Sequence, residues 1–368
     1  MSASRIISGL NHLSQIASFE YRSAKFLACL KVSVSNEVVT FMNALVPSID
    51  GRLFVLGFVI IPAALLAITL VEKNPPVRPA DADSAVAIWD IDLKLAKNSP
   101  RNFRTTDGPL NAKKDEIPVT NGLRDLHASG SGEFTPEGLK LVLAQTRGPV
   151  TIFDLRQETH IFVNDLPVSW YASRDWMNVG RNHSTIEADE DSRVQTLKPV
   201  GHMDIREGEL VKKGSASPVT PQRVIVARAS TERDVVEAAG AKYVRLTVTD
   251  HARPVDDEVD RFVLAVRALP ENAWAHFHCE AGLGRTTTFM VLYDMLRNAT
   301  RVSLEDIVRR QKDLSRGYDV LQPPESDNWK RPYAEERAAF ARAFYDYARA
   351  NPNGRPQLWS EWLKSSTH

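Results

Sequence analysis

The chain has 368 residues, of which 43% are hydrophobic and 25% are charged, as in an ordinary globular protein with a large core. Its 46 basic and 46 acidic side chains balance, so the net charge of zero gives no sign of nucleic-acid binding. A polyanionic ligand would have to be attracted by a local cluster of charges. Cys29 and Cys279 are the only cysteines, which is too few for a disulfide framework.

The front of the chain contains an apolar run. Residues 53–71 carry no charge and are long enough to span a bilayer, and Pro62 near the middle is compatible with a span. Five basic residues and few acids precede the run, which favours a cytoplasmic N-terminus and an exported body. If translation begins at Met42, the run is the apolar region of a secretory signal, and the third interpretation is a buried core helix.

These features predict the organisation of the first quarter of the chain. We expect a tail over 1–50, a transmembrane anchor or signal segment over 51–73, and a proline-rich linker and lead-in over 74–98. The body that follows is predicted to be exported, periplasmic or extracytoplasmic. It would be held at the membrane through residues 53–71, or secreted after cleavage of that segment.

From about residue 99, helix and strand patterns alternate. Thr135 and Pro136 begin a helix, Asn164-Asp165 form the turn of a hairpin over 161–171, and 254–268 has the spacing of an amphipathic helix. The other predicted strands are 150–155, 243–248 and 273–279, and the other predicted helices are 230–239, 286–296 and 334–348. This order predicts an α/β fold, a central sheet flanked by helices, over 99–368. Residues 158–222 have short polar strands and turns that fit a β-rich insert.

Residues 278–286, His-Cys-Glu-Ala-Gly-Leu-Gly-Arg-Thr, combine a nucleophile, an anion cradle and a cation. Cys279 lies where a strand leads into a helix N-terminus, whose free N–H groups and dipole favour an anion and a thiolate. Gly282 and Gly284 let the backbone curl around one phosphate, and Arg285 can hold two phosphate oxygens. The pattern predicts a cysteine phosphatase. The phosphate would be surrounded by loop residues Glu280, Ala281, Gly282, Leu283, Gly284 and Thr286.

A phosphatase of this kind also needs a general acid, because the leaving alkoxide is too basic to depart unprotonated. Asp250 follows the predicted strand 243–248 and precedes a helix, so it lies at the strand edge where α/β sites gather. The alternative is that Asp250 only caps that helix. In the first interpretation Cys279 attacks, Asp250 donates a proton, and water hydrolyses the phosphocysteine. This chemistry requires no metal and no other cofactor.

The sequence resembles the protein tyrosine phosphatase-like phytases, bacterial phosphatases of myo-inositol hexakisphosphate. Residues 278–287 match the family's signature, and the resemblance extends over about 88–368. Its other blocks are 100–104, 126–131, 154–158, 167–171, 174–176, 249–251 and 359–364.

The resemblance implies a phosphatase-like core, a central mixed sheet with helices, that carries a small partial β-barrel. It also implies a wide basic pocket for a phosphorylated inositol, with Asp250 as general acid. His251 and Asp175 would lie near the substrate, Lys330 would border the pocket, and Arg337 occupies a position that is often basic in the family. Residues 198–209 are predicted as a loop with few lysines for a phytate contact.

Three functions fit these residues. The first is a phytase that removes phosphate from inositol hexakisphosphate and lower inositol phosphates. The second is a protein tyrosine or dual-specificity phosphatase, since the same loop serves both and only pocket width and rim charge separate them. The third is a catalytically silent phosphate-binding module, against which the intact Cys279, Arg285 and Asp250 argue.

Overall fold

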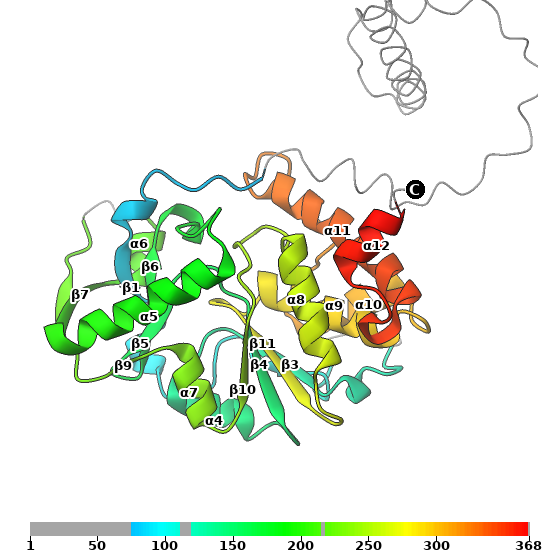
Figure 1. Ribbon diagram of the computed structural model, residues 1–368, viewed down its shortest axis with the longest axis horizontal. Helices are drawn as coiled ribbons and strands as arrows, with labels where there is room; N and C mark the ends of the chain where they lie inside the picture. The colour runs from blue at the N-terminus through cyan, green and yellow to red at the C-terminus, as the bar shows by residue number, and fades with distance from the viewer. Residues whose placement is uncertain (1–74, 111–118, 215–217, 367–368) are drawn as a thin grey trace, which may run out of the picture. The chain divides into compact units, whose positions relative to one another are not determined.

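A computed structural model describes residues 75–110, 119–214 and 218–366 (Figure 1). The predicted tail over 1–50 and the apolar run over 53–71 lie outside these residues. Within the described ranges, no helix combines the length and apolar character needed to cross a membrane. The described part is a mixed α/β structure with two sheets flanked by helices, as predicted.

The first sheet has five strands in the order β10-β4-β11-β3-β2. Three of its four pairings are parallel, and β2 is antiparallel to β3. The carboxyl ends of β10, β4, β11 and β3 therefore meet at one edge, where functional loops gather in α/β proteins. The strands are β2 Arg104–Thr105, β3 Ala128–Ser131, β4 Val150–Asp154, β10 Lys242–Arg245 and β11 Trp274–His278.

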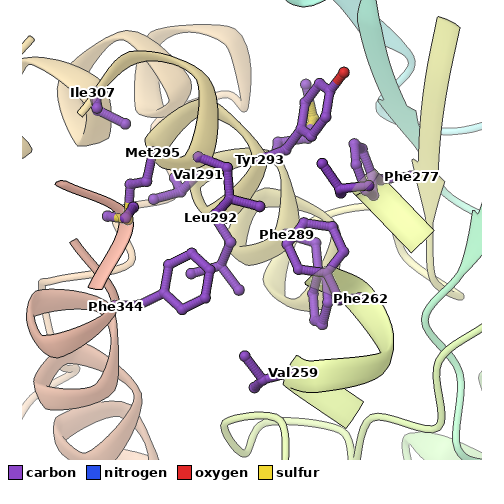
Figure 2. Close-up of a cluster of buried hydrophobic side chains, with 14 of the residues drawn as sticks. Val259, Phe262, Phe277, Phe289, Val291, Leu292, Tyr293, Met295, Ile307 and Phe344 are labelled. Atoms are coloured by element: carbon purple, nitrogen blue, oxygen red, sulfur yellow. The ribbon is translucent and has the colours of Figure 1, made fainter. Parts of the chain in front are cut away.

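Helices cover both faces of this sheet, because successive strand side chains point to opposite faces. Phe153 and Phe277 pack toward α9 and α8, as Figure 2 shows for Phe277, whereas Ile152 packs with Leu139 and Val236 on the other face. The first face is covered by α8 Asp256–Arg267, α9 Gly284–Asn298, α10 Leu304–Leu314, α11 Arg331–Ala350 and α12 Trp359–Ser366. The second is covered by α4 Pro136–Leu143 and α7 Glu232–Ala238.

Helix α9 is the centre of the larger core. Every residue from Arg285 to Leu296 is buried, in accord with the prediction of a helix that is apolar on nearly every face. Figure 2 shows Phe289, Val291, Leu292 and Met295 of α9 surrounded by side chains from neighbouring elements. This packing holds the start of α9, and therefore Arg285, in a fixed place.

The second sheet has six strands in the order β8-β7-β1-β6-β5-β9. The predicted hairpin is confirmed as β5 and β6, with Asn164 at φ 50° and Asp165 at φ 69° in the turn. The strands are β1 Val86–Trp89, β5 His160–Val163, β6 Leu166–Tyr171, β7 His202–Glu207, β8 Gln222–Ile225 and β9 Ala229–Ser230. The helices α5 His183–Val200 and α6 Gly208–Lys212 belong to this part. Short 3-10 turns are Ala82–Ser84, Leu93–Leu95, Arg124–Leu126, Ser173–Asp175 and Pro352–Gly354.

This part differs from the predicted β-rich insert over 158–222. The 18-residue helix α5 lies within that range and was not predicted, because its buried residues are only Ile186, Glu190 and Val194, too narrow a stripe among charged residues. The sheet also takes β1 from the predicted linker and β9 from beyond residue 222. The predicted loop over 198–209 is instead the end of α5, strand β7 and the start of α6. The partial barrel stays a prediction.

Candidate active site

Cys279 directly follows β11 and is only 3% exposed. Its Sγ accepts hydrogen bonds from the backbone N–H of Gly282 at 3.3 Å and from Oγ1 of Thr286 at 3.2 Å. A hydrogen bond to sulfur is stronger when the sulfur is charged. Two donors therefore converge on the sulfur that the sequence predicts as the nucleophile.

The loop after Cys279 is held from outside by its carbonyl groups. Glu280 O accepts from the backbone N–H of Glu133 at 3.1 Å, Ala281 O from Asn102 Nδ2 at 2.8 Å, and Gly282 O from Arg104 Nη1 at 2.8 Å. With these three carbonyl oxygens turned outward, the N–H groups on the opposite side of the peptides face the inside of the loop. This arrangement is the one expected of the predicted anion cradle, whose role stays a prediction.

The two glycines of the loop have different roles. Gly282 has φ 76°, and a Cβ there would lie 2.2 Å from the backbone nitrogen of Gly132, so only glycine fits. Gly284 begins α9 outside the left-handed region, and a Cβ would meet Tyr318 OH at an ordinary 3.4 Å. The prediction that Gly284 also lets the backbone curl was therefore wrong. Leu283 precedes α9 as its N-cap residue and Ala281 is exposed.

Arg285 is 4% exposed and is held as a fork. Nη1 and Nη2 donate to Oε2 and Oε1 of Glu158 at 2.6 and 2.9 Å. Burial lowers the pKa of Arg285, but Glu158 and Asp250 outweigh burial and raise it well above its ordinary value. Nε lies 3.1 Å from Oδ1 of Asp250 and makes no hydrogen bond to any described residue. A buried N–H without an acceptor beside the loop is a ready donor for a phosphate oxygen.

Glu158 joins Arg285 to the second sheet, and the sequence analysis assigned it no role. It is 1% exposed, and its Oε1 also accepts from Arg156 Nε at 2.9 Å. Arg156 in turn donates to Asp90 Oδ2 at 3.2 Å and to Glu133 Oε2 at 2.8 Å. Burial raises the pKa of Glu158, but Arg285 and Arg156 hold it well below its ordinary value. The only sequence signal for a role of Glu158 in the site was its position just after β4, at the edge of the sheet where functional loops gather.

Asp250 faces Arg285 from the segment that follows β10. Its side chain is 19% exposed, and Oδ2 lies 2.9 Å from Nε2 of His251, which has φ 66°. The residue before the first turn of α8 is Val255, so the alternative that Asp250 caps this helix is wrong. Burial raises the pKa of Asp250, whereas Arg285 and then His251 lower it well below its ordinary value. The free site therefore holds Asp250 as a carboxylate.

A lysine that the sequence analysis did not single out forms ion pairs with two predicted site residues. Lys212, the last residue of α6, lies 3.3 Å from Oδ2 of Asp175 and forms an ion pair with Oε2 of Glu280. Burial lowers the pKa of Lys212, but Glu280 and Asp175 outweigh it and raise the pKa. The predicted site residues Asp175 and Glu280 thus meet at one cation. No local pattern marks Lys212, which lies just past the predicted loop.

Lys330 lies at the rim, away from the cradle. It precedes α11 as N-cap residue, and its Nζ is 5.5 Å from the centroid of the Trp329 ring. The edge of His251 meets the same ring, with centroids 5.1 Å apart. Arg337 lies on α11 and donates from Nη1 to the backbone oxygen of His251 at 2.8 Å. The structure therefore brings His251 to the centre of the site and places Lys330 at its border.

One group of side chains has the composition of a metal site. Asp154, Glu232 and His278 each offer a ligand atom, all within 4.8 Å of one another. Oδ2 of Asp154 already lies 2.7 Å from Tyr243 OH and 2.9 Å from Arg245 Nη1. The negative charge there is balanced by the protein's own cation, so these residues do not fit a further one.

Known proteins are similar to this chain in sequence and in fold. The sequence model of the PTP-like phytase family, which carries the description "Inositol hexakisphosphate", matches residues 153–297. The effector protein hopD2 of Pseudomonas syringae pv. tomato is 36% identical over 266 residues, 71% of this chain and 56% of that protein. This chain therefore spans just over half the length of that relative.

Two solved structures are similar over most of the chain. A PTP-like phytase from Bdellovibrio bacteriovorus has 42% sequence identity and a TM-score of 0.62, over 80% of this chain and 99% of that one. The PTP-like myo-inositol phosphatase from Mitsuokella multacida, solved in complex with myo-inositol-(1,3,4,5)-tetrakisphosphate, has 34% identity and a TM-score of 0.69. That match covers 82% of this chain and 52% of that one. On these similarities, this chain belongs to the protein tyrosine phosphatase-like phytase family.

Proposed function

We propose that this chain is a cysteine-dependent phosphomonoester hydrolase that removes phosphate from inositol hexakisphosphate and lower inositol phosphates. The observation that carries the proposal is the position of three groups around one loop. Cys279 Sγ has two donors, Arg285 Nε makes no hydrogen bond within the described residues, and Oδ1 of Asp250 forms an ion pair with that nitrogen at 3.1 Å. These are a nucleophile, an oxyanion donor and a proton carrier.

In the first step, the Sγ–P bond forms as the thiolate of Cys279 attacks phosphorus. The loop N–H groups and Arg285 hold the equatorial oxygens, whose charge they stabilise without reorganisation. The P–O ester bond breaks, and its electron pair stays on the ester oxygen, which takes a proton from Asp250. The products of this step are an inositol phosphate with one phosphate fewer and a phosphocysteine.

In the second step, water attacks the phosphorus of the phosphocysteine. Asp250, now a carboxylate, removes a proton from that water, and the S–P bond breaks with its electron pair returning to Cys279. Thr286 and the N–H of Gly282 receive the thiolate again, since they are its donors in the free site. Inorganic phosphate leaves, Asp250 releases that proton to solvent in the free site, and it takes up a proton again when the next substrate raises its pKa.

The choice of an inositol polyphosphate rests on the basic side chains around the loop. Lys212 lies between two carboxylates at the mouth, and His251 and Lys330 border Trp329. A substrate with several phosphates can contact these groups at once, whereas a phosphotyrosyl side chain brings one phosphate. The inositol phosphate bound to the Mitsuokella multacida relative supports the same choice.

The substrate is tested by phosphate release from phytate and from a phosphotyrosyl peptide, with the full chain and with Cys279→Ser as the blank. We expect kcat/KM for phytate to exceed that for the peptide by roughly tenfold or more, the value of one additional charged hydrogen bond. Activity should persist in a chelator. A peptide that is turned over as well as phytate would overturn the substrate assignment but not the chemistry.

Asp250→Asn is expected to lower kcat for phytate by about 10²- to 10⁴-fold, the usual contribution of a general acid. Substrate phosphate attracts Arg285 away from Asp250 and brings negative charge, so the pKa of Asp250 rises on binding. Because this pKa lies well below its ordinary value in the free site, kcat/KM of the parent should increase toward acidic pH. In Asp250→Asn, kcat should no longer decrease as pH rises.

An aryl phosphate whose leaving group needs no proton is the control for this variant. Asp250→Asn should lose much less activity on the aryl ester than on phytate. Equal losses on both substrates, with the pH profile unchanged, would show that Asp250 does not donate the proton.

A further inference from the structure

Arg174 is an exposed arginine at the rim of the site, and no acidic side chain of the described residues pairs with it. Its guanidinium carbon lies 4.3 Å from the ring centroid of Trp329 and 5.1 Å from that of Trp176. Within the described ranges, the guanidinium of Arg174 makes no hydrogen bond and no ion pair. A guanidinium that rests against aromatic rings satisfies none of its N–H donors with an acceptor, so these donors remain available to an anion.

The two rings that hold Arg174 also contact the general-acid segment. Trp176 donates from Nε1 to the backbone oxygen of Asp250 at 2.9 Å, and Trp329 meets the ring of His251 edge to face. The two indoles meet each other at 80°, with centroids 5.9 Å apart. Arg174 and Asp250 therefore contact the same indole, and a single side chain separates the free guanidinium from the proton donor.

This arrangement fixes the position of a cation that would otherwise be mobile. An exposed arginine usually loses rotamer freedom when it binds an anion, and stacking on two rings removes part of that cost in advance. The next residue, Asp175, pairs with Lys212, whose other carboxylate partner is Glu280 of the loop. A free guanidinium beside these groups suits a phosphate other than the one that is cleaved.

We propose that Arg174 binds a second phosphate of the substrate and that Trp329 and Trp176 position it for this contact. The inference rests on the proposed function, since it deepens the choice of a polyphosphate. It makes Arg174 a specificity-determining residue. Substrates with phosphates on neighbouring carbons are favoured over those with one phosphate, because only the former reach the reactive loop and Arg174 together.

The test measures binding without turnover. In the Cys279→Ser background, Arg174→Gln should weaken the binding of phytate by roughly tenfold or more, the value of a charged hydrogen bond. It should weaken the binding of inorganic phosphate by much less. Arg174→Lys should restore only part of the affinity, because an ammonium cannot stack as a planar fork. Trp329→Leu should weaken phytate in the same direction, since it removes the nearer ring.

The matched control is Arg193, which stacks on Trp170 at 4.2 Å in the second sheet. Arg193→Gln should leave both affinities as they are, and melting temperatures identify any variant that fails to fold. Equal weakening of phytate and phosphate by Arg174→Gln, or no weakening of phytate, would overturn the inference. A parent Cys279→Ser protein that binds phosphate but not phytate would overturn the proposed substrate as well, and so separates the two failures.

Discussion

Replacing Cys279 by serine is expected to reduce phosphate release from every phosphomonoester by roughly 10⁴-fold or more, as expected when a covalent nucleophile is removed. The two donors to Sγ stabilise a thiolate, but a serine hydroxyl stays protonated at neutral pH and attacks poorly. The hydroxyl is smaller than the thiol and leaves the loop carbonyl contacts untouched, so phosphate binding should persist. Single-turnover release of phosphate with the full chain checks this.

The matched control is the chain's second cysteine. Cys29→Ser removes a thiol of the same kind from outside the described residues and should leave kcat and KM as they are. Trapping of labelled phosphate on the protein after acid quenching should occur in the parent and in Cys29→Ser, and be absent from Cys279→Ser. Phosphate release by Cys279→Ser close to that of the parent would overturn the covalent mechanism.

Glu158→Gln is expected to destabilise the fold by about 3–5 kcal/mol, the cost of removing one partner from a buried ion pair. Glu158 holds both Nη atoms of Arg285 and the Nε atom of Arg156, and the amide leaves these two buried cations short of an acceptor. Because Arg285 loses its fork partner, kcat should also fall. Denaturant unfolding gives the free energy, and kinetics on the folded fraction give the activity.

The pH dependence of stability has a definite sign at this residue. The pKa of Glu158 is lower in the folded state than its ordinary value, so its contribution is complete above about pH 4.3 and is lost progressively as pH falls further. Glu158→Gln should remove that acid-dependent loss. Glu190→Gln breaks a comparable buried pair, with Arg245, that does not involve Arg285. It should destabilise the protein, but its folded fraction should be more active than that of Glu158→Gln. Equal activity losses in both variants would contradict a direct role of Glu158 on Arg285.

The sequence was informative wherever the chemistry is local. The strand, turn and helix around Cys279 lie within 25 consecutive residues, 274–298, so composition and glycine placement suffice to predict them. Asp250 was left between two interpretations, and the structure removed the helix-cap alternative because α8 begins after Val255. Patterns of this kind report backbone conformation and charge close to each residue.

Contacts between distant segments could not be predicted in this way. Lys212 meets Asp175 and Glu280 across 37 and 68 positions, and no periodicity in the sequence records such a meeting. Arg174 was part of a family block without a role, since its free guanidinium becomes visible only beside Trp329. Helix α5 was missed for a different reason, because its surface is polar and only a narrow stripe is buried.

Strand β1 has a consequence for where a working fragment of this protein can begin. Val86–Trp89 lies inside the second sheet, antiparallel to β6 on one side and parallel to β7 on the other. Asp90, which follows it, is an acceptor for Arg156. A shortened chain that starts at residue 99 would split this sheet into two pieces and remove a carboxylate from the charged cluster behind the catalytic arginine. A working fragment therefore includes part of the segment over 74–98 that the sequence predicted as a linker and lead-in. N-terminal deletions should end before residue 86.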